Sequence, residues 1–225
     1  GITYMTSKSR KILCPSILNL PVDHLQEEIR NLNNADIDIF HVDIMDGSFV
    51  PNFGMSLREI DLIRANTDKL IDCHMMVQFP SRHIQAVAEH GADIIYIHPE
   101  SEICPSETLA QIRALGKKAG LVLNPCTSLE SVEDMLEIVD YLMMMGVNPG
   151  YAGRPFLEWL YPKFAKLMEI RKRYSFKVVL DGGATREVIS KLYHEFAVEG
   201  FVLGKQELFF QDRPYEECVR YIRSL

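Results

Sequence analysis

The chain has 225 residues, of which 47% are apolar and 24% charged, a balance typical of a globular protein and not of a disordered or fibrous one. The net charge of −7 argues against nucleic acid or an anionic membrane as a partner, because binding many phosphates requires a basic face. No apolar run approaches the roughly 18–20 residues of a membrane span and no signal pattern opens the chain, so we expect a cytoplasmic protein.

The cysteines and the start of the chain give two further expectations. The five cysteines are odd in number and contain no Cys-x-x-Cys pair, so we predict reduced thiols and neither a disulfide framework nor a zinc ribbon. Residues 1–4 precede Met5 and are interpreted as an expression remnant, with Met5 as the native start. No break in composition follows, and we predict one domain over residues 1–225.

Short apolar runs alternate with longer segments of helical period along the whole chain. The predicted strands are Ile12 to Leu18, Ile37 to Met45, Leu70 to Val77, Ile94 to His98, Ala119 to Asn124, Tyr141 to Met145, Lys177 to Asp181 and Phe201 to Gly204. The predicted helices are Val22 to Leu32, Leu57 to Ala65, Ser81 to His90, Glu107 to Lys117, Leu129 to Val139, Phe156 to Tyr174, Thr185 to Glu195 and Arg213 to Arg223.

Repeated βα units of this length predict parallel strands, and eight of them predict an α/β fold of the single (β/α)8 TIM barrel type. The alternative is a doubly wound open sheet. That fold needs fewer strands and usually carries a Gly-x-Gly-x-x-Gly turn after the first strand, where this chain has Cys14-Pro15-Ser16-Ile17-Leu18. The pattern therefore favours the closed barrel.

In such a barrel, functional side chains lie at the C-terminal ends of the strands. Period-two alternation puts His41, Asp43 and Met45 on one face of the second strand, and apolar neighbours on the face that would meet the helices. A histidine and an aspartate would then point into the barrel mouth. Unpaired charges there cost several kcal/mol unless they are paired or bind a metal.

Two more strands repeat this arrangement. Asp72, His74 and Met76 share one face of the third strand, and the seventh strand ends in Asp181. Two imidazoles and two carboxylates suit a divalent ion of the Zn, Fe, Mn or Co type better than Ca or Mg, which prefer oxygen ligands. The alternative for each residue alone is a hydrogen-bonded structural role, but convergence of four at one mouth favours a metal site.

Glycine-rich turns follow the late strands at Gly150-Tyr151-Ala152-Gly153, Asp181-Gly182-Gly183 and Gly204-Lys205. Their default interpretation is a turn. Such turns also expose backbone N–H groups, and the loops after the last strands of a barrel commonly hold phosphate. Met45, Met76 and Met145 are by default core residues, since methionine fills irregular gaps.

These motifs resemble the ribulose-phosphate 3-epimerase family in order and spacing over nearly the whole chain. The matching stretches are Pro15-Ser16-Ile17-Leu18, His41-Val42-Asp43-Ile44-Met45-Asp46-Gly47 with Phe49-Val50-Pro51-Asn52, Asp72-Cys73-His74-Met75-Met76, Val147-Asn148-Pro149-Gly150 and Asp181-Gly182-Gly183. The resemblance implies a (β/α)8 barrel and epimerisation of a phosphorylated ketose, most simply D-ribulose 5-phosphate to D-xylulose 5-phosphate. It also implies a homo-oligomer, a dimer or a hexamer.

The resemblance assigns roles residue by residue. It implies one divalent transition metal per subunit, with His41, Asp43, His74 and Asp181 as its ligands. Asp43 and Asp181 would also be the two acid/base groups, one for each face of the substrate. The residues that would contact the substrate are Ser16, the methionine lining Met45, Met76 and Met145, and Gly150, Gly153, Gly182, Gly183, Gly204 and Lys205 around the phosphate.

The chemistry explains these residue types. Epimerisation at C3 removes a weakly acidic proton beside the C2 carbonyl and returns one on the other face, so it needs two carboxylates in different protonation states. A divalent ion would stabilise the enediolate electrostatically. A thioether lining has no proton to give and excludes water.

The chain departs from the family's usual pattern at three places, which bear on substrate identity. Gly146 stands where threonine is common, Arg154 where glutamine is common, and Gly204-Lys205-Gln206-Glu207 where Gly-Ser-Ala-Ile is usual. Ile97-His98-Pro99-Glu100 and Leu70-Ile71-Asp72-Cys73-His74 are similar to the branch acting on D-allulose 6-phosphate, which remains the close alternative. Two further alternatives are a non-catalytic sugar-phosphate-binding barrel and a metal-dependent hydrolase.

Overall fold

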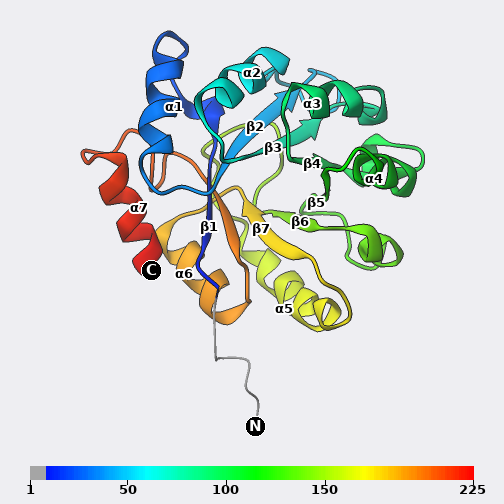
Figure 1. Ribbon diagram of the computed structural model, residues 1–225. Helices are drawn as coiled ribbons and strands as arrows, with labels where there is room; N and C mark the ends of the chain where they lie inside the picture. The colour runs from blue at the N-terminus through cyan, green and yellow to red at the C-terminus, as the bar shows by residue number, and fades with distance from the viewer. Residues whose placement is uncertain (1–8) are drawn as a thin grey trace.

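Eight parallel strands form a ring with helices outside it (Figure 1). The structure is a computed structural model that describes residues 9–225, so the interpretation of residues 1–4 as an expression remnant lies outside the described residues. The strands are β1 (Ile12–Pro15), β2 (Ile39–Met45), β3 (Leu70–Met76), β4 (Ile94–Ile97), β5 (Lys118–Leu123), β6 (Tyr141–Met145), β7 (Lys177–Asp181) and β8 (Gly200–Leu203).

The strand order is β1-β8-β7-β6-β5-β4-β3-β2. At the two ends of this order, a parallel bridge between Ser16 and His41 joins the end of β1 to β2. The predicted (β/α)8 TIM barrel is confirmed. In residues 9–225, no helix is long and apolar enough to cross a membrane.

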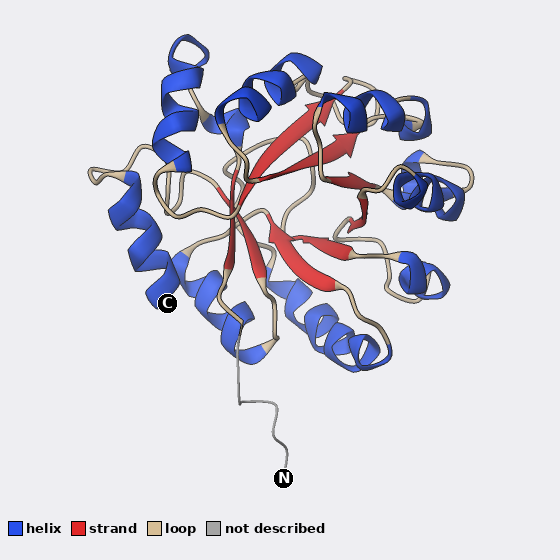
Figure 2. Cartoon of the chain, in the orientation of Figure 1, coloured by secondary structure: helices blue, strands red, loops and turns tan. Residues whose placement is uncertain are grey.

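Seven α-helices within the described residues surround the strands (Figure 2). They are α1 (Leu25–Asn33), α2 (Leu57–Asn66), α3 (Ile84–His90), α4 (Pro105–Ala114), α5 (Tyr161–Ile170), α6 (Arg186–Glu195) and α7 (Tyr215–Ser224). Short 3₁₀ helices complete the connections, at Ile17–Asn19, Val22–His24, Pro80–Arg82, Pro99–Ser101, Glu133–Ile138, Glu158–Leu160 and Arg171–Arg173.

The helix predicted over Leu129 to Val139 is wrong as an α-helix, because the segment holds only the 3₁₀ helix Glu133–Ile138. Ser128 and Ser131 form a local turn before it. Ser131 N–H donates to Ser128 Oγ (3.2 Å), and Ser131 Oγ donates to the Ser128 carbonyl (2.7 Å). Such side-chain bonds to nearby backbone compete with the helical ladder.

The helix predicted over Phe156 to Tyr174 is shorter than expected. Its α-helical part is α5, flanked by 3₁₀ turns on both sides. Pro162 lies in the first turn of α5, where its missing N–H costs nothing. Several other boundaries also move inward; for example, β1 ends at Pro15 and α1 begins at Leu25.

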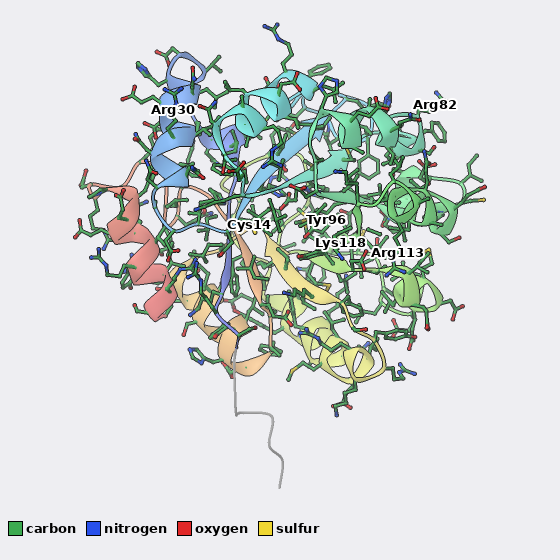
Figure 3. The ribbon with its side chains drawn as sticks, viewed as in Figure 1. Cys14, Arg30, Arg82, Tyr96, Arg113 and Lys118 are labelled. Atoms are coloured by element: carbon green, nitrogen blue, oxygen red, sulfur yellow. The ribbon has the colours of Figure 1, made fainter. Side chains whose placement is uncertain are left out.

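Two apolar layers hold the ring together. Phe40 and Val42 pack with the helices in the larger core, as period-two alternation predicts. The interior of the barrel is filled separately by a second cluster that includes Cys14, Ile39 and Tyr96, and Figure 3 shows Cys14 and Tyr96 near the centre of the ring. The interior of the barrel is therefore packed with side chains.

One device joins the strands in pairs at the N-terminal end of the barrel. An acidic residue directly before each even-numbered strand accepts a hydrogen bond from the second backbone N–H of the preceding odd-numbered strand. The four bonds are Leu13 to Asp38 (2.8 Å), Ile71 to Asp93 (2.9 Å), Ala119 to Asp140 (2.8 Å) and Val178 to Glu199 (2.8 Å). Each acidic residue also donates its own N–H to the carbonyl of the same partner. We call these four contacts the basal joints.

An arginine pairs with the carboxylate of every basal joint. The pairs are Arg223 with Asp38, Arg64 with Asp93, Arg113 with Asp140, and Arg171 with Glu199. Charge-assisted bonds of this kind are stronger than neutral ones. The joints fix strand register at the base and leave the opposite end of the barrel for chemistry.

Candidate active site

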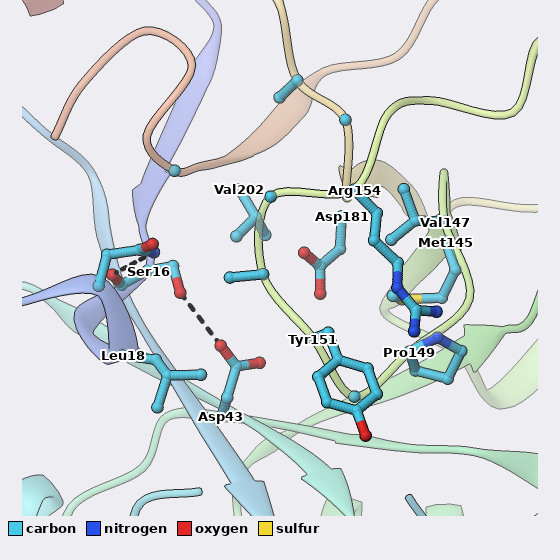
Figure 4. Close-up of a pocket in the computed structure, with 18 of the residues that line it drawn as sticks. Ser16, Leu18, Asp43, Met145, Val147, Pro149, Tyr151, Arg154, Asp181 and Val202 are labelled. Atoms are coloured by element: carbon cyan, nitrogen blue, oxygen red, sulfur yellow. Dashed lines mark hydrogen bonds between the residues drawn. The ribbon is translucent and has the colours of Figure 1, made fainter. Parts of the chain in front are cut away.

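A cavity of about 650 Å³, a volume that includes its open mouth, lies at the C-terminal ends of the strands. All the predicted substrate-binding residues line it, namely Ser16, Met45, Met76, Met145, Gly150, Gly153, Gly182, Gly183, Gly204 and Lys205. Asp43 and Asp181 line it as well. Figure 4 shows these two carboxylates projecting into the space between the loops.

The floor of the cavity brings the four predicted metal ligands together. One ligand atom from each of His41, Asp43, His74 and Asp181 lies within 4.8 Å of the others. His41 Nε2 is 3.0 Å from Asp43 Oδ1, and His74 Nδ1 is 3.2 Å from Asp181 Oδ2. Both imidazoles are fully buried, so they lie beneath the cavity while the carboxylates face both the histidines and the open space.

Two features of the cluster suit a divalent ion: the types of its donor atoms and a buried nitrogen without a hydrogen-bond partner. His74 Nδ1 is buried and makes no hydrogen bond of good geometry, which is the condition expected of a nitrogen placed to receive a cation. Two nitrogen and two oxygen donors suit Zn, Fe, Mn or Co. The geometry is therefore that of a candidate metal centre.

Each buried histidine has a second partner behind it. His41 Nδ1 is 2.5 Å from Asp72 Oδ1, and His74 Nε2 is 2.7 Å from His98 Nε2. The sequence pattern already put Asp72 on the inner face of its strand, but His98 was not among the predicted site residues. Its position directly after β4, at the functional end of a barrel strand, was the available signal.

Burial and neighbouring charges shift the pKa values of the groups in this cluster. Burial alone would lower the pKa of His41, but the carboxylates of Asp72 and Asp43 outweigh it and raise that pKa well above its usual value. Burial would raise the pKa of Asp43, but His41 and His74 lower it. The pKa of His98 is instead depressed, first by burial and then by the neighbouring His74, so its imidazole is neutral.

Ser16 and the methionines shape the space around the carboxylates. Ser16 Oγ donates to Asp43 Oδ2 over 3.1 Å (Figure 4). Met45 and Met76 are buried and pack with Val50 at the mouth of the barrel. The wall next to the carboxylates is therefore largely thioether and hydrocarbon, which offers no acidic proton.

Two loops meet across the mouth. Asn52 Nδ2 donates to the Gly150 carbonyl (2.9 Å), and the Tyr151 hydroxyl donates to the Pro51 carbonyl (3.0 Å). These contacts join segments about a hundred residues apart, and no local sequence pattern indicates them. They partly roof the cavity on the side of Arg154, whose guanidinium lies 4.7 Å from the Tyr151 ring centroid.

Charge is divided between the floor and the rim of the cavity. Among the described lining residues, the acidic side chains are Asp43 and Asp181 and the basic ones are Arg154 and Lys205. Both basic residues are exposed and come from loops after late strands. A ligand with an anionic end fits this polarity, because that end would meet cations at the rim while the rest reaches the floor.

Two departures from the family pattern have a local structural cause. A Cβ at Gly146 would lie 2.3 Å from the Gly182 carbonyl oxygen and 2.8 Å from Phe156 Cδ2, so no larger residue fits this backbone. Glu207 is buried, and its Oε1 accepts from the backbone N–H and from Nε of Arg186, both over 3.0 Å. This carboxylate ties the loop after β8 to the start of α6.

The fold and this arrangement define a (β/α)8 barrel enzyme that places paired carboxylates and buried histidines in one mouth. The profile of the ribulose-phosphate 3 epimerase family matches residues 12–208. The chain belongs to the ribulose-phosphate 3-epimerase family and is an isomerase.

Named relatives agree over most of the chain. It is 37% identical to the ribulose-phosphate 3-epimerase of Aquifex aeolicus over 96% of both chains. The Synechocystis sp. ribulose-phosphate 3-epimerase is 42% identical over 71% of this chain and 70% of its own. The chloroplastic ribulose-5-phosphate-3-epimerase of Arabidopsis thaliana is 36% identical over 97% of this chain and 78% of its own.

Solved structures show how widely the fold is shared. KGPDC from Streptococcus mutans aligns with a TM-score of 0.70 over 96% of this chain and 97% of its own, at 12% identity. The 3-keto-L-gulonate-6-phosphate decarboxylase of Vibrio cholerae aligns with a TM-score of 0.70 over 96% and 98%, at 11% identity. At such identities the likeness concerns the fold alone.

Proposed function

We propose that the chain catalyses metal-dependent epimerisation at C3 of a ketose phosphate, converting D-ribulose 5-phosphate to D-xylulose 5-phosphate. The observation that carries the proposal is the pairing of Asp43 and Asp181 in one cavity, above two buried histidines. Family membership supports the same reaction. The protein would work as a homo-oligomer, a dimer or a hexamer, in the cytoplasm.

The metal would be held by His41, Asp43, His74 and Asp181. When bound, one divalent transition ion (Zn, Fe, Mn or Co) supplies Lewis-acid stabilisation of the negative charge that develops on the substrate oxygens. The carboxylate charge of the site also helps to balance the charge of the ion.

The two aspartates divide the proton transfers. Asp43 Oδ1 faces His41, whereas Oδ2 accepts from Ser16 on the cavity side, so Oδ2 is the atom placed to take or return a proton. Asp181 turns Oδ2 to the histidines and has Oδ1 for the same task. One aspartate takes the C3 proton while the other, protonated, supplies one to the opposite face.

The remaining lining residues bind and protect the substrate. Lys205, Arg154 and the glycine turns at the rim would hold the phosphate. Gly183 is one of these glycines, and a Cβ on it would lie 2.6 Å from the backbone of Phe156. The methionine wall keeps water from the reacting carbons. This geometry favours a carbanion reaction over activation of water, which argues against the hydrolase alternative.

Asp43→Asn and Asp181→Asn test the proposal. Each removes one proton carrier, so we expect each to lower the rate of epimerisation by at least about a thousandfold, with unchanged far-UV circular dichroism. The assay follows ribulose 5-phosphate in deuterated water by NMR, which also records deuterium entering at C3. Activity within about tenfold of wild type in either variant would contradict the acid/base assignment.

The same assay decides between substrates. Allulose 6-phosphate is run in parallel, and faster turnover of that hexulose would assign the chain to the allulose 6-phosphate branch. If metal-loaded protein converts neither ribulose 5-phosphate nor allulose 6-phosphate, the result would favour the non-catalytic sugar-phosphate-binding barrel.

A further inference from the structure

His98 is a fully buried imidazole that the proposed reaction does not use directly. It follows β4 and immediately precedes the 3₁₀ helix Pro99–Ser101, where Ser101 Oγ donates to its carbonyl over 2.7 Å. Its ring has two aromatic neighbours, since the ring centroids of His74 and Phe49 both lie 4.9 Å from its own, and His74 meets it through the Nε2 atoms. The fold therefore restrains both the backbone and the ring of His98.

The contact between His98 and His74 determines where the protons lie. Two imidazole nitrogens at 2.7 Å form a hydrogen bond only if one of them carries a proton and the other does not. His74 Nδ1 faces Asp43 Oδ1 (3.4 Å) and Asp181 Oδ2 (3.2 Å). A nitrogen that binds a cation there must be free of a proton, so the proton of His74 is on Nε2 and His98 Nε2 accepts it.

On the other side of the ring, His98 Nδ1 is buried and makes no hydrogen bond of good geometry. Glu100 Oε2 is 3.9 Å away, too far for a hydrogen bond, and the Asn124 side chain also lies near the ring. The contact with His74 is therefore the hydrogen bond that orients the His98 ring.

The two metal-facing histidines thus have different partners. His41 donates to the carboxylate of Asp72, which makes its other nitrogen more basic. His74 donates to a neutral imidazole, which orients the ring without adding charge. A carboxylate in place of His98 would be a fourth acidic group beside Asp43, Asp72 and Asp181, and would add further negative charge to a buried cluster.

We propose that His98 is a positioning residue that holds His74 with Nδ1 directed at the metal and thereby sets metal affinity. This inference rests on the metal site of the proposed function and adds to it a residue outside the ligand set. Partners of metal-binding histidines typically change affinity by about tenfold to a hundredfold when removed.

Zinc affinity, measured by competition with a chromophoric chelator, tests the proposal. We expect His98→Leu, which keeps volume but accepts no hydrogen bond, to weaken zinc binding by about tenfold to a hundredfold. His98→Gln keeps an acceptor oxygen and should recover a large part of the loss. Phe49→Leu is the packing control: it alters the other ring that contacts His98 and should leave zinc affinity within about threefold of wild type.

Two spectroscopic readouts separate positioning from general stability. The cobalt-loaded protein should show a changed visible absorption spectrum in His98→Leu and an unchanged one in Phe49→Leu. In zinc-loaded wild type, nitrogen-15 NMR of the histidine rings should find Nε2 of His74 protonated and Nε2 of His98 unprotonated, which needs no variant to fold.

The outcomes are distinguishable from failure of the proposed function. Unchanged zinc affinity in folded His98→Leu, or a proton on His98 Nε2, overturns the role of His98 while leaving the metal site in place. Wild type that epimerises ribulose 5-phosphate without holding any divalent transition metal overturns the metal site and His98 together, and leaves the reaction. Wild type that binds zinc but turns over neither sugar overturns the reaction alone.

Discussion

Asp43 shows how much of this site depends on single atoms. One of its carboxylate oxygens faces two buried histidines and the other faces a serine hydroxyl. Its alternation with His41 along β2 was readable from the sequence. The division of tasks between its two oxygens was not, because it depends on Ser16, which follows β1 and meets β2 only when the barrel closes.

Lys205 is the residue whose role is most open to measurement. It stands where the family usually has serine, and it lines the rim of the cavity as an exposed side chain. We expect Lys205→Ser to raise KM for ribulose 5-phosphate by up to about tenfold with little change in kcat, because phosphate is bound equally in ground and transition states. Steady-state kinetics at low ionic strength measure this.

The control for Lys205 is Lys166→Ser, an exposed lysine on α5 that does not line the cavity. It removes the same charge at a distance and should leave KM unchanged. The Lys205 effect should shrink as salt is added, since exposed charges are screened. An equal KM for Lys205→Ser and wild type at low salt would show that the ammonium does not contact the phosphate.

At the scale of elements, the basal joints predict a pH dependence of stability. Burial raises the pKa of Asp140, but bonds from the Arg113 guanidinium and the Ala119 N–H outweigh it and leave the pKa lowered. A carboxyl whose pKa is lowered by folding stabilises the protein above its unfolded pKa of about 4. That stability is lost as the pH falls through the lower, folded value.

Asp140→Asn tests this joint. We expect it to lower the free energy of unfolding by about 1 kcal/mol at neutral pH, a modest value because Arg113 is partly exposed. The difference from wild type should shrink as the pH falls below the unfolded pKa of about 4, and disappear once the carboxyl of the folded wild type is also protonated. Urea unfolding across this pH range measures it, with Asp68→Asn at an exposed site as the control. A difference that is independent of pH would assign the loss to geometry and not to charge.

The elements differ in how far the sequence predicted them. All eight strands were placed within a few residues, because buried parallel strands are short apolar runs between turn residues. The segment Leu129 to Val139 has helical period but becomes a 3₁₀ helix, since the serines before it hold the backbone in a local turn. The strands that carry the metal ligands were identified by alternation. The His74–His98 and Asn52–Gly150 contacts join segments that are distant along the chain, so no local pattern indicates them.

At the scale of the whole molecule, metal removal should affect both activity and stability. The four candidate ligands come from β2, β3 and β7, so an ion held by them links strands that are distant along the chain. We expect prolonged chelation to abolish epimerisation and to lower the melting temperature, because a bound ion stabilises the folded state alone. Zn, Mn, Co or Fe(II) should restore both, and Mg should not.

Activity assays, calorimetry and elemental analysis of the same sample check this prediction. Protein dialysed in the same way without chelator controls for losses during dialysis. Fully active protein that contains no transition metal would contradict the metal site. Restoration by Mg would instead indicate that oxygen donors dominate the centre.

The basal joints repeat around the barrel in a way that the order of residues along the chain does not show. Arg64, Arg113 and Arg171 come from the helical segment that precedes the odd-numbered strand of their joint. Arg223 on α7 holds the same place before β1, because β8 and β1 are neighbours in the ring. At its N-terminal end the barrel therefore consists of four repeated units, each made of two strands, one acidic residue and one arginine. The unit that contains β1 is built like the other three. A circular permutant, with the present ends joined and new ends placed between any two units, would therefore keep all four basal joints.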